Sequence, residues 1–265
     1  ILGGENPPKT LRAIIDFSGT GLQHSSDNLN APLSVVRSAV MYVLRTLIDL
    51  DIPLNGGCLR PVTIIIPEGT ILNPLYPAPV ASGNVETSQR IVDVLLGCLK
   101  IAGASQGTMN NFSFQVEGEY PYYETIAGGA GAIEGCDGAS GIHVHMTNTK
   151  LTDPEILAHR HPGVLLERFS LRKNSGGKGR YKGGDGVIRE IKFLKPSVVS
   201  ILSERRVFSP YGMEGGDEGE KGINILKKAD GKEIILRHRE SLRLEAVDSI
   251  LMMTPGGGGY GKIES

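Results

Sequence analysis

Residues 119–149 read EYPYYETIAGGAGAIEGCDGASGIHVHMTNT and hold most of the reactive side chains of the sequence. Glycine at this density stops helix formation and lets backbone approach closely, because glycine adopts positive φ without steric cost. The flanks are typical of strands, since residues 120–127 are aromatic and β-branched and residues 142–147 alternate apolar with polar. We therefore expect two strands joined by a pliable loop, with His143 and His145 on one face.

This stretch has two interpretations that its residues alone leave open. Catalytic centres are commonly held on loops above a rigid sheet, and Glu124, His143 and His145 are side chains that can move protons. The alternative is a glycine-rich hairpin with a solvated polar face. Alternate histidines also make half of a metal site, but no third ligand stands at a clear spacing, so we predict no metal site in this chain.

The totals exclude several function classes. The 265 residues suffice for one large or two small domains, and a net charge of −1 gives no reason to expect a nucleic acid or a charged membrane as partner. No apolar run approaches the roughly 20 residues that span a bilayer. Cys58, Cys98 and Cys136 fit neither a disulfide framework nor a metal motif, which favours the reducing cytoplasm.

The composition changes near residue 150, and we expect an α+β fold with a boundary there. Residues 1–150 form a mixed α/β part that carries the site, with strands predicted at 11–17, 62–66 and 112–117 and two main helices at 32–50 and 85–102. The run at 62–66, VTIII, is apolar enough for a strand buried on both faces. Residues 151–265 form a β-rich part, with strands at 164–172, 187–194, 198–203, 223–228, 233–236 and 249–253, and Asp230-Gly231 suits a tight hairpin turn.

Five further polar residues are candidates for the site. Asp16 ends the first predicted strand, and we take it with Glu124, His143 and His145 as a catalytic candidate. The amides Asn30, Asn84, Asn111 and Asn148 are candidates for binding a polar substrate. Asx-turns and helix capping are the ordinary alternative roles for such residues.

Two glycine-rich runs do not make nucleotide sites. Residues 256–261, GGGGYG, match the dinucleotide-binding pattern, but no helix follows to hold a pyrophosphate. Residues 172–182, RKNSGGKGRYK, are able to wrap an anion, although a solvated turn is the favoured interpretation. If the activity needs ATP, the nucleotide site lies elsewhere.

Eight segments, taken in order, resemble the hydantoinase B/5-oxoprolinase family: DFSGTGLQHSSDNLNAP, IPLNGGCLRP, PEGTILNP, ASGNVETSQR, YYETIAGGAGA, DGASGIHVHMTNT, RKNSGGKGRYKGGDG and TPGGGGYG. The resemblance runs from about residue 13 to residue 261. Family members are roughly twice this length, so the chain is similar to the C-terminal half of a B-type subunit. Its start at Ile1, without methionine, agrees with the expectation of a piece of something longer.

The resemblance implies ATP-dependent opening of a cyclic amide, either 5-oxoproline or a hydantoin. A hydantoinase A-type partner would bind the ATP, and the N-terminal half of the B-type subunit would hold any divalent metal. Glu124 or one of the two histidines would act as general base on water. Alternatives are the equivalent part of an ATP-dependent acetone or acetophenone carboxylase, and a non-catalytic assembly scaffold.

Overall fold

The computed structural model describes residues 12–263, and the chain separates into two compact units, residues 1–91 (unit 1) and 92–265 (unit 2). Unit 1 holds β1 (Ala13–Asp16), α1 (Leu33–Leu47), the 3₁₀ turn η1 (Gly56–Leu59), β2 (Val62–Ile65) and the π-helical turn η2 (Gly83–Thr87). Helix α2 (Ser88–Cys98) runs across the division. None of the helices in the described range is long and apolar enough to cross a membrane.

In unit 1, β1 and β2 form a two-stranded parallel sheet in which Ile15 pairs with Ile64. Helix α1 buries the stripe Val36, Ala39, Val40 and Val43, as its apolar periodicity predicts. The prediction that β2 is buried on both faces is wrong here, because alternate side chains of this strand are exposed. The second predicted helix, residues 85–102, begins as the π turn and ends at Cys98.

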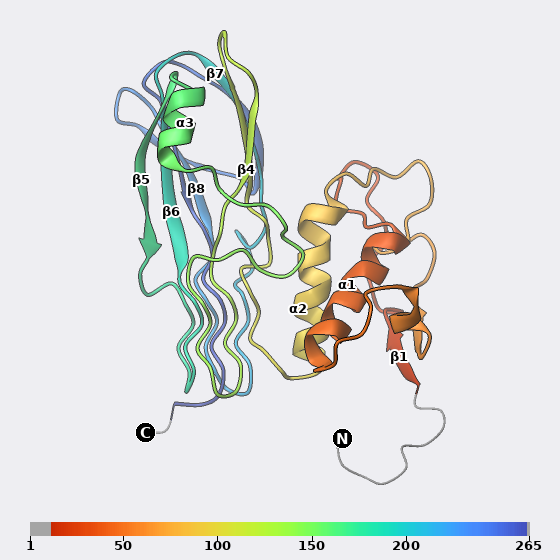
Figure 1. The fold of residues 1–265 in the computed structure, drawn as a ribbon. Coiled ribbons are helices and arrows are strands. Elements are labelled where there is room, and N and C mark those ends of the chain that lie inside the picture. The colour runs from red at the N-terminus through yellow and green to blue at the C-terminus, as the bar shows by residue number, and fades with distance from the viewer. Residues whose placement is uncertain (1–11, 264–265) are drawn as a thin grey trace. The chain divides into compact units, whose positions relative to one another are not determined.

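Unit 2 contains two antiparallel sheets packed face to face with α3 (Pro154–Arg160) beside them (Figure 1). The four-stranded sheet has the order β10-β7-β3-β4, built from β3 (Asn111–Val116), β4 (Tyr122–Thr125), β7 (Ser197–Leu202) and β10 (Arg239–Leu244). The five-stranded sheet has the order β5-β6-β11-β8-β9, built from β5 (Val164–Arg172), β6 (Gly186–Phe193), β8 (Ile223–Lys227), β9 (Glu233–Leu236) and β11 (Ser249–Met253).

One apolar core joins the inner faces of these sheets. Phe112 and Phe114 of β3 lie in the same buried cluster as Ile191 and Phe193 of β6, and Phe114 meets Phe193 edge to face at 5.4 Å. The α+β class is confirmed. The division falls after Ile91 and not near residue 150, because β3 and β4 hydrogen-bond into the same sheet as β7 and β10.

Below the sandwich in Figure 1 run five extended segments that we call the glycine bundle: residues 101–108, 127–142, 174–186, 209–222 and 254–262. Their backbones hydrogen-bond across segments, for example from Gly257 N to Gly184 O at 2.8 Å and from Gly258 N to Ala104 O at 2.8 Å. A Cβ added to Gly257 would lie 1.9 Å from Ala130 O, so only glycine allows this approach. Most of the glycine-rich run 172–182 and all of the run 256–261 thus lie in the bundle.

Candidate functional site

Asp93, His145 and Arg205 form a compact charged cluster in unit 2. The Oδ1 atom of Asp93 lies 2.9 Å from Nε2 of His145, and its Oδ2 atom accepts a hydrogen bond of 3.0 Å from Nη2 of Arg205. Asp93 and Arg205 are buried, whereas the side chain of His145 keeps 13% of its surface exposed. Of the three, His145 is therefore the group best placed to meet an outside molecule.

The charge state of Asp93 follows from these contacts. Burial alone would raise the pKa of Asp93, but the hydrogen bond and charge of His145, the charge of Arg205 and the Ser105 N–H outweigh it. The pKa of Asp93 accordingly lies below its ordinary value, and the carboxylate is ionised at neutral pH. An ionised carboxylate at Nε2 accepts a hydrogen bond best from a protonated Nε2, and so it orients the imidazole ring.

The glycine bundle and its connecting loops position this cluster. Ser105, on the first bundle segment, donates its N–H to Asp93 at 3.0 Å, and Tyr211, on the fourth, donates its hydroxyl to the Asp93 carbonyl. Gly107 has φ +59°, and a Cβ there would lie 2.7 Å from Nε of Arg205 and 2.9 Å from Oδ2 of Asp93. Position 107 must therefore be glycine for the Asp93–Arg205 pair to form.

Both side chains that hold Asp93 come from strained backbone. His145 has φ +50° and Arg205 has φ +59°, a left-handed conformation that costs a non-glycine residue on the order of 1–3 kcal/mol. Strain of this kind is concentrated at functional sites, because surrounding structure must maintain it. Two such residues on one carboxylate make this cluster the strongest site candidate among residues 12–263.

The predicted strand at 142–147 is wrong, and with it the placement of the two histidines on one strand face. Only Ile142 pairs, in an isolated bridge with Gly128, and His145 lies in a turn with positive φ. His143 is partly buried, its Nδ1 lacks a hydrogen-bond partner among the described residues, and burial lowers the pKa of its imidazole. The positive φ of His145 turns the backbone within this stretch, so the alternating pattern does not form a strand.

Glu124 lies inside the sandwich and does not join His145. Arg189 donates two hydrogen bonds to its carboxylate, at 2.7 Å from Nε and 2.8 Å from Nη2, and Tyr122 donates its hydroxyl at 2.8 Å. Burial, followed by the charge of Glu124, raises the pKa of Tyr122 to about 12. With both oxygens occupied, the geometry favours a role for Glu124 in holding the fold over a role as base.

The remaining candidates lie in several places. Asp16, in unit 1, is exposed and accepts from Ser18, whose hydrogen bonds lower the pKa of Asp16. Asn30 is buried and its amide ties His24, Asp27 and Pro79 together. In unit 2, Asn111 bonds Leu202 O and the Tyr123 hydroxyl. Asn84 and Asn148 are exposed. Substrate binding by these four amides stays a prediction.

Asp93 and Arg205 were missed by sequence reasoning, because neither stands in a recognisable motif. Asp93 is a polar residue on the buried side of a helix. The apolar periodicity of the residues around it is a signal that could have placed it on that side. Arg205 follows β7 in a loop whose backbone conformation the sequence does not reveal. Their pairing joins residues 112 positions apart.

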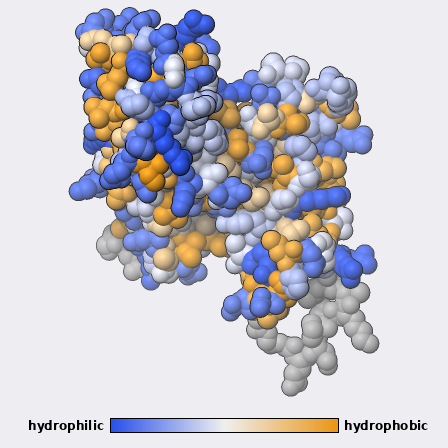
Figure 2. All heavy atoms as spheres, turned by 45° about the horizontal axis from the view of Figure 1, so that its top comes forward, coloured by the Kyte–Doolittle hydropathy of each residue, from blue (hydrophilic) through white to orange (hydrophobic). Residues whose placement is uncertain are grey.

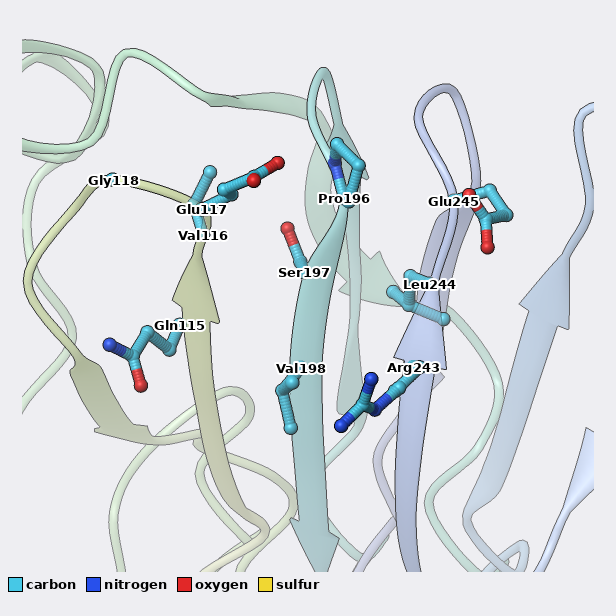
Figure 3. Close-up of a pocket in the computed structure, with 10 residues that line it drawn as sticks. All are labelled: Gln115, Val116, Glu117, Gly118, Pro196, Ser197, Val198, Arg243, Leu244 and Glu245. Carbon is cyan, nitrogen blue, oxygen red and sulfur yellow. The ribbon is translucent and has the colours of Figure 1, made fainter.

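No group of three or more His, Cys, Asp or Glu side chains in the described part of the chain is arranged to hold a metal ion. Both oxygens of Asp93 are already engaged by His145, Ser105 and Arg205. A pocket at the end of the four-stranded sheet (Figure 3) includes no histidine and none of the predicted site residues; it is lined by Gln115, Val116, Glu117, Gly118, Pro196, Ser197, Val198, Arg243, Leu244 and Glu245.

Comparison with known proteins gives consistent matches over nearly the whole chain. The family model described as Hydantoinase B/oxoprolinase matches residues 8–263. A protein named 5-oxoprolinase 1, from Arabidopsis thaliana, is 52% identical over 249 residues, which are 94% of this chain and 19% of that protein. The chain thus spans about a fifth of the length of this relative.

Two solved structures share the fold. The ATP-dependent caprolactamase from Pseudomonas jessenii has a TM-score of 0.76 at 22% identity, over 91% of this chain and 45% of that one. A nucleotide-free acetone carboxylase has a TM-score of 0.78 at 17% identity, over 94% of this chain and 39% of that one. At these identities the likeness shows the fold alone.

Proposed function

Because the chain belongs to the hydantoinase B/oxoprolinase family, we propose that it is part of an ATP-dependent hydrolase that opens a small cyclic amide, 5-oxoproline or a hydantoin. The observation that carries this proposal is the 52% identity, over 94% of the chain, to a relative named 5-oxoprolinase. The caprolactamase that shares the fold is also, by its name, an enzyme of a cyclic amide that uses ATP.

The chemistry explains why ATP is required. A lactam carbonyl is stabilised by resonance with its nitrogen, so water attacks it slowly. Phosphorylation of the carbonyl oxygen makes the carbon electrophilic, and water then adds while a base removes its proton. In this proposal a hydantoinase A-type partner binds the ATP, and this chain supplies groups for the attack of water and the stabilisation of the intermediate.

We assign the proton transfer to His145. The Asp93 carboxylate, 2.9 Å from Nε2, orients the imidazole and stabilises it once it is protonated, so Asp93 is a positioning residue. Arg205 balances the negative charge of Asp93 in this buried place. The proton leaves water for His145 and is then available to the ring nitrogen when the C–N bond breaks. The acyl phosphate that remains is hydrolysed by a second water to the carboxylate and inorganic phosphate.

The acetone carboxylase fold supports a second candidate, the equivalent part of an ATP-dependent ketone carboxylase. The two functions differ in their need for bicarbonate. Turnover of 5-oxoproline or a hydantoin without bicarbonate supports the hydrolase, and strict bicarbonate dependence with a ketone substrate supports the carboxylase. A cytoplasmic location is in keeping with the use of ATP and with three unpaired cysteines.

The test is an assay of ATP-dependent 5-oxoproline and hydantoin cleavage in the assembly with the A-type partner and the remainder of the B-type subunit. The chain alone should be inactive, and His145→Gln should lower kcat of the assembly by about 10²–10⁴-fold. His159→Gln, at an exposed position of α3, is the matched control and should leave kcat unchanged. Full activity of His145→Gln would leave the scaffold role as the better description.

A further inference from the structure

A pocket of about 630 Å³ lies in the glycine bundle of unit 2. Its lining holds two tyrosines and five charged side chains, which are Lys100, Glu134, Arg180, Glu214 and Lys262. Each of the five bundle segments, or the residue just before it, contributes to this lining. The volume is within the range of roughly 300–1,000 Å³ in which proteins bind small molecules.

The backbone beside this pocket distinguishes it from the rest of the surface. Charge alone does not mark a site, because hydrophilic residues cover much of the surface, as the blue areas of Figure 2 show. Lys100 has φ +56° and Glu214 has φ +50°, and both values are in the left-handed region. Two non-glycine residues of this conformation also hold Asp93, and strain of this kind is concentrated at functional sites.

Hydrogen bonds hold the walls of the pocket in place. The Arg180 N–H donates to the Gly261 carbonyl at 3.0 Å. Tyr181 and Tyr260 exchange two backbone hydrogen bonds of 2.9 Å. The Tyr260 hydroxyl donates to the Lys100 carbonyl at 3.1 Å. The chain therefore forms this pocket by itself, as is usual for small-molecule sites.

Three of the five charged side chains are engaged within the chain. Nζ of Lys100 lies 3.1 Å from Oε1 of Glu214. The guanidinium of Arg180 lies 5.8 Å from the centre of the Tyr181 ring, which is within the range of a cation–π contact.

The other two charges, the ammonium of Lys262 and the carboxylate of Glu134, have no hydrogen-bond or ion-pair partner among residues 12–263. Lys262 lies across Gly215, where an added Cβ would come within 2.4 Å of its Cγ. Burial, followed by the charges of Glu134 and Glu214, raises the pKa of Tyr260, so its phenol is protonated at neutral pH. A cation and an anion that line one pocket without pairing are complementary to a molecule that carries both charges.

We propose that this pocket binds a small zwitterionic amino acid, with its carboxylate at Lys262 and its ammonium at Glu134. The choice of ligand rests on the proposed function, because the opening of a lactam frees an amine and a carboxylate on one molecule, and 5-oxoproline thus gives glutamate. The opening of a hydantoin leaves a carbamoyl group on the nitrogen, and that product carries no ammonium. The pocket therefore matches the product of a lactam better than that of a hydantoin.

The test is a calorimetric titration of the assembly with L-glutamate in the absence of ATP. Lys262→Ala and Glu134→Gln should each weaken binding about tenfold or more, because each removes one of the two uncompensated charges. Lys232→Ala and Glu233→Gln are the matched controls, since both residues are exposed and lie at the turn before β9. Both controls should bind L-glutamate as wild type does.

Two analogues of the ligand test which charge each residue recognises. Glutarate lacks the ammonium and propylamine lacks the carboxylates, so each should bind at least about tenfold more weakly than L-glutamate. The preference for L-glutamate over glutarate should disappear in Glu134→Gln, because that variant has no carboxylate to meet the ammonium. A change of fold alone would not produce this selective loss, and a melting temperature equal to wild type shows that each variant is folded.

Three results would overturn the proposal: no binding of L-glutamate by the wild type up to about 10 mM, equal binding of glutarate, or unchanged binding in both variants. The kcat of ring opening should be unchanged in both variants, since neither residue belongs to the Asp93 cluster. Binding without any ring opening would refute the proposed function and leave this site standing. Ring opening without such binding would refute this site alone.

Discussion

The carboxylate of Glu124 and the guanidinium of Arg189 are joined by two parallel hydrogen bonds of 2.7 and 2.8 Å between the two sheets of unit 2. Both side chains are almost fully buried, and the guanidinium also lies 5.3 Å from the centre of the Phe169 ring. The pair links β4 of one sheet to β6 of the other. The Glu124–Arg189 pair therefore specifies how the two sheets pack against each other.

Removing one partner of this pair should therefore be costly. We expect Glu124→Leu to lower the free energy of unfolding by about 3–5 kcal/mol, because Arg189 would remain charged and unpaired in the core. The double variant Glu124→Leu/Arg189→Met should recover to within about 1 kcal/mol of wild type. Urea unfolding of the single and double variants checks this. A double variant as unstable as the single one would contradict it.

In the active assembly, Glu124→Gln separates the structural role from the catalytic one. We expect activity to fall only in proportion to the folded fraction, since Glu124 is enclosed by Arg189 and Tyr122. The measurement is kcat at 25 °C beside the melting temperature. A large fall in kcat at an unchanged melting temperature would restore Glu124 as the base.

Asp93→Asn should lower kcat about 10²-fold or more and leave KM nearly unchanged, because the imidazole of His145 loses the carboxylate that orients it. Asp153→Asn, at an exposed aspartate before α3, is the control and should behave as wild type. Steady-state kinetics of both variants in the assembly test this. Equal kcat for wild type and Asp93→Asn would remove Asp93 from the mechanism.

The pH dependence of stability should reveal the low pKa of Asp93. A carboxyl whose folded pKa lies below its unfolded value of 3.8 stabilises the fold above that value, and the contribution is lost as the pH falls through the folded pKa. The difference in free energy of unfolding between wild type and Asp93→Asn should thus shrink as the pH falls below about pH 4. Urea titrations at pH 5, 4 and 3 measure it; a difference that grows from pH 4 to pH 3 would contradict it.

Gly257→Ala should prevent folding of unit 2 or destabilise it by more than about 4 kcal/mol, since the added Cβ would meet the Ala130 backbone at 1.9 Å. Gly19→Ala is the control, because a Cβ there has no atom within 4 Å. We expect that variant to be neutral or stabilised by up to about 1 kcal/mol. Thermal unfolding followed by circular dichroism distinguishes them.

Much of the fold could be predicted from local sequence. The apolar periodicity of α1 and the sequence patterns of β5 to β8 and β11 predict these elements to within a few residues of their observed bounds. Asp230-Gly231 forms the predicted hairpin turn, with φ +87° at Gly231. Strand β10, RESLRL, was missed because its charges and exposed outer face hide the alternation. The sequence of β2 is typical of an interior strand, and the local sequence does not reveal that one face of the strand is exposed.

The candidate site was predicted only in part, for a physical reason. His145 stood out by its residue type, but its partners Asp93 and Arg205 come from a helix and from a distant loop. Their meeting depends on the glycine bundle, whose contacts are made by backbone atoms. Residue types carry little information about backbone-to-backbone packing, beyond the statement that glycine permits it.

The glycine bundle has a consequence for how stability varies with temperature. Unfolding it exposes peptide groups and little apolar side-chain surface, and polar exposure lowers the heat capacity whereas apolar exposure raises it, by about −0.26 and +0.45 cal/mol/K per Å². The bundle therefore adds less to the heat-capacity change of unfolding than an equal length of the sandwich does. The stability curve of unit 2 should be correspondingly broad. Calorimetry should find a heat-capacity change of unfolding below the usual value of about 12–15 cal/mol/K per residue. Such a unit should retain more of its free energy of unfolding at low temperature than one held together by apolar contacts alone.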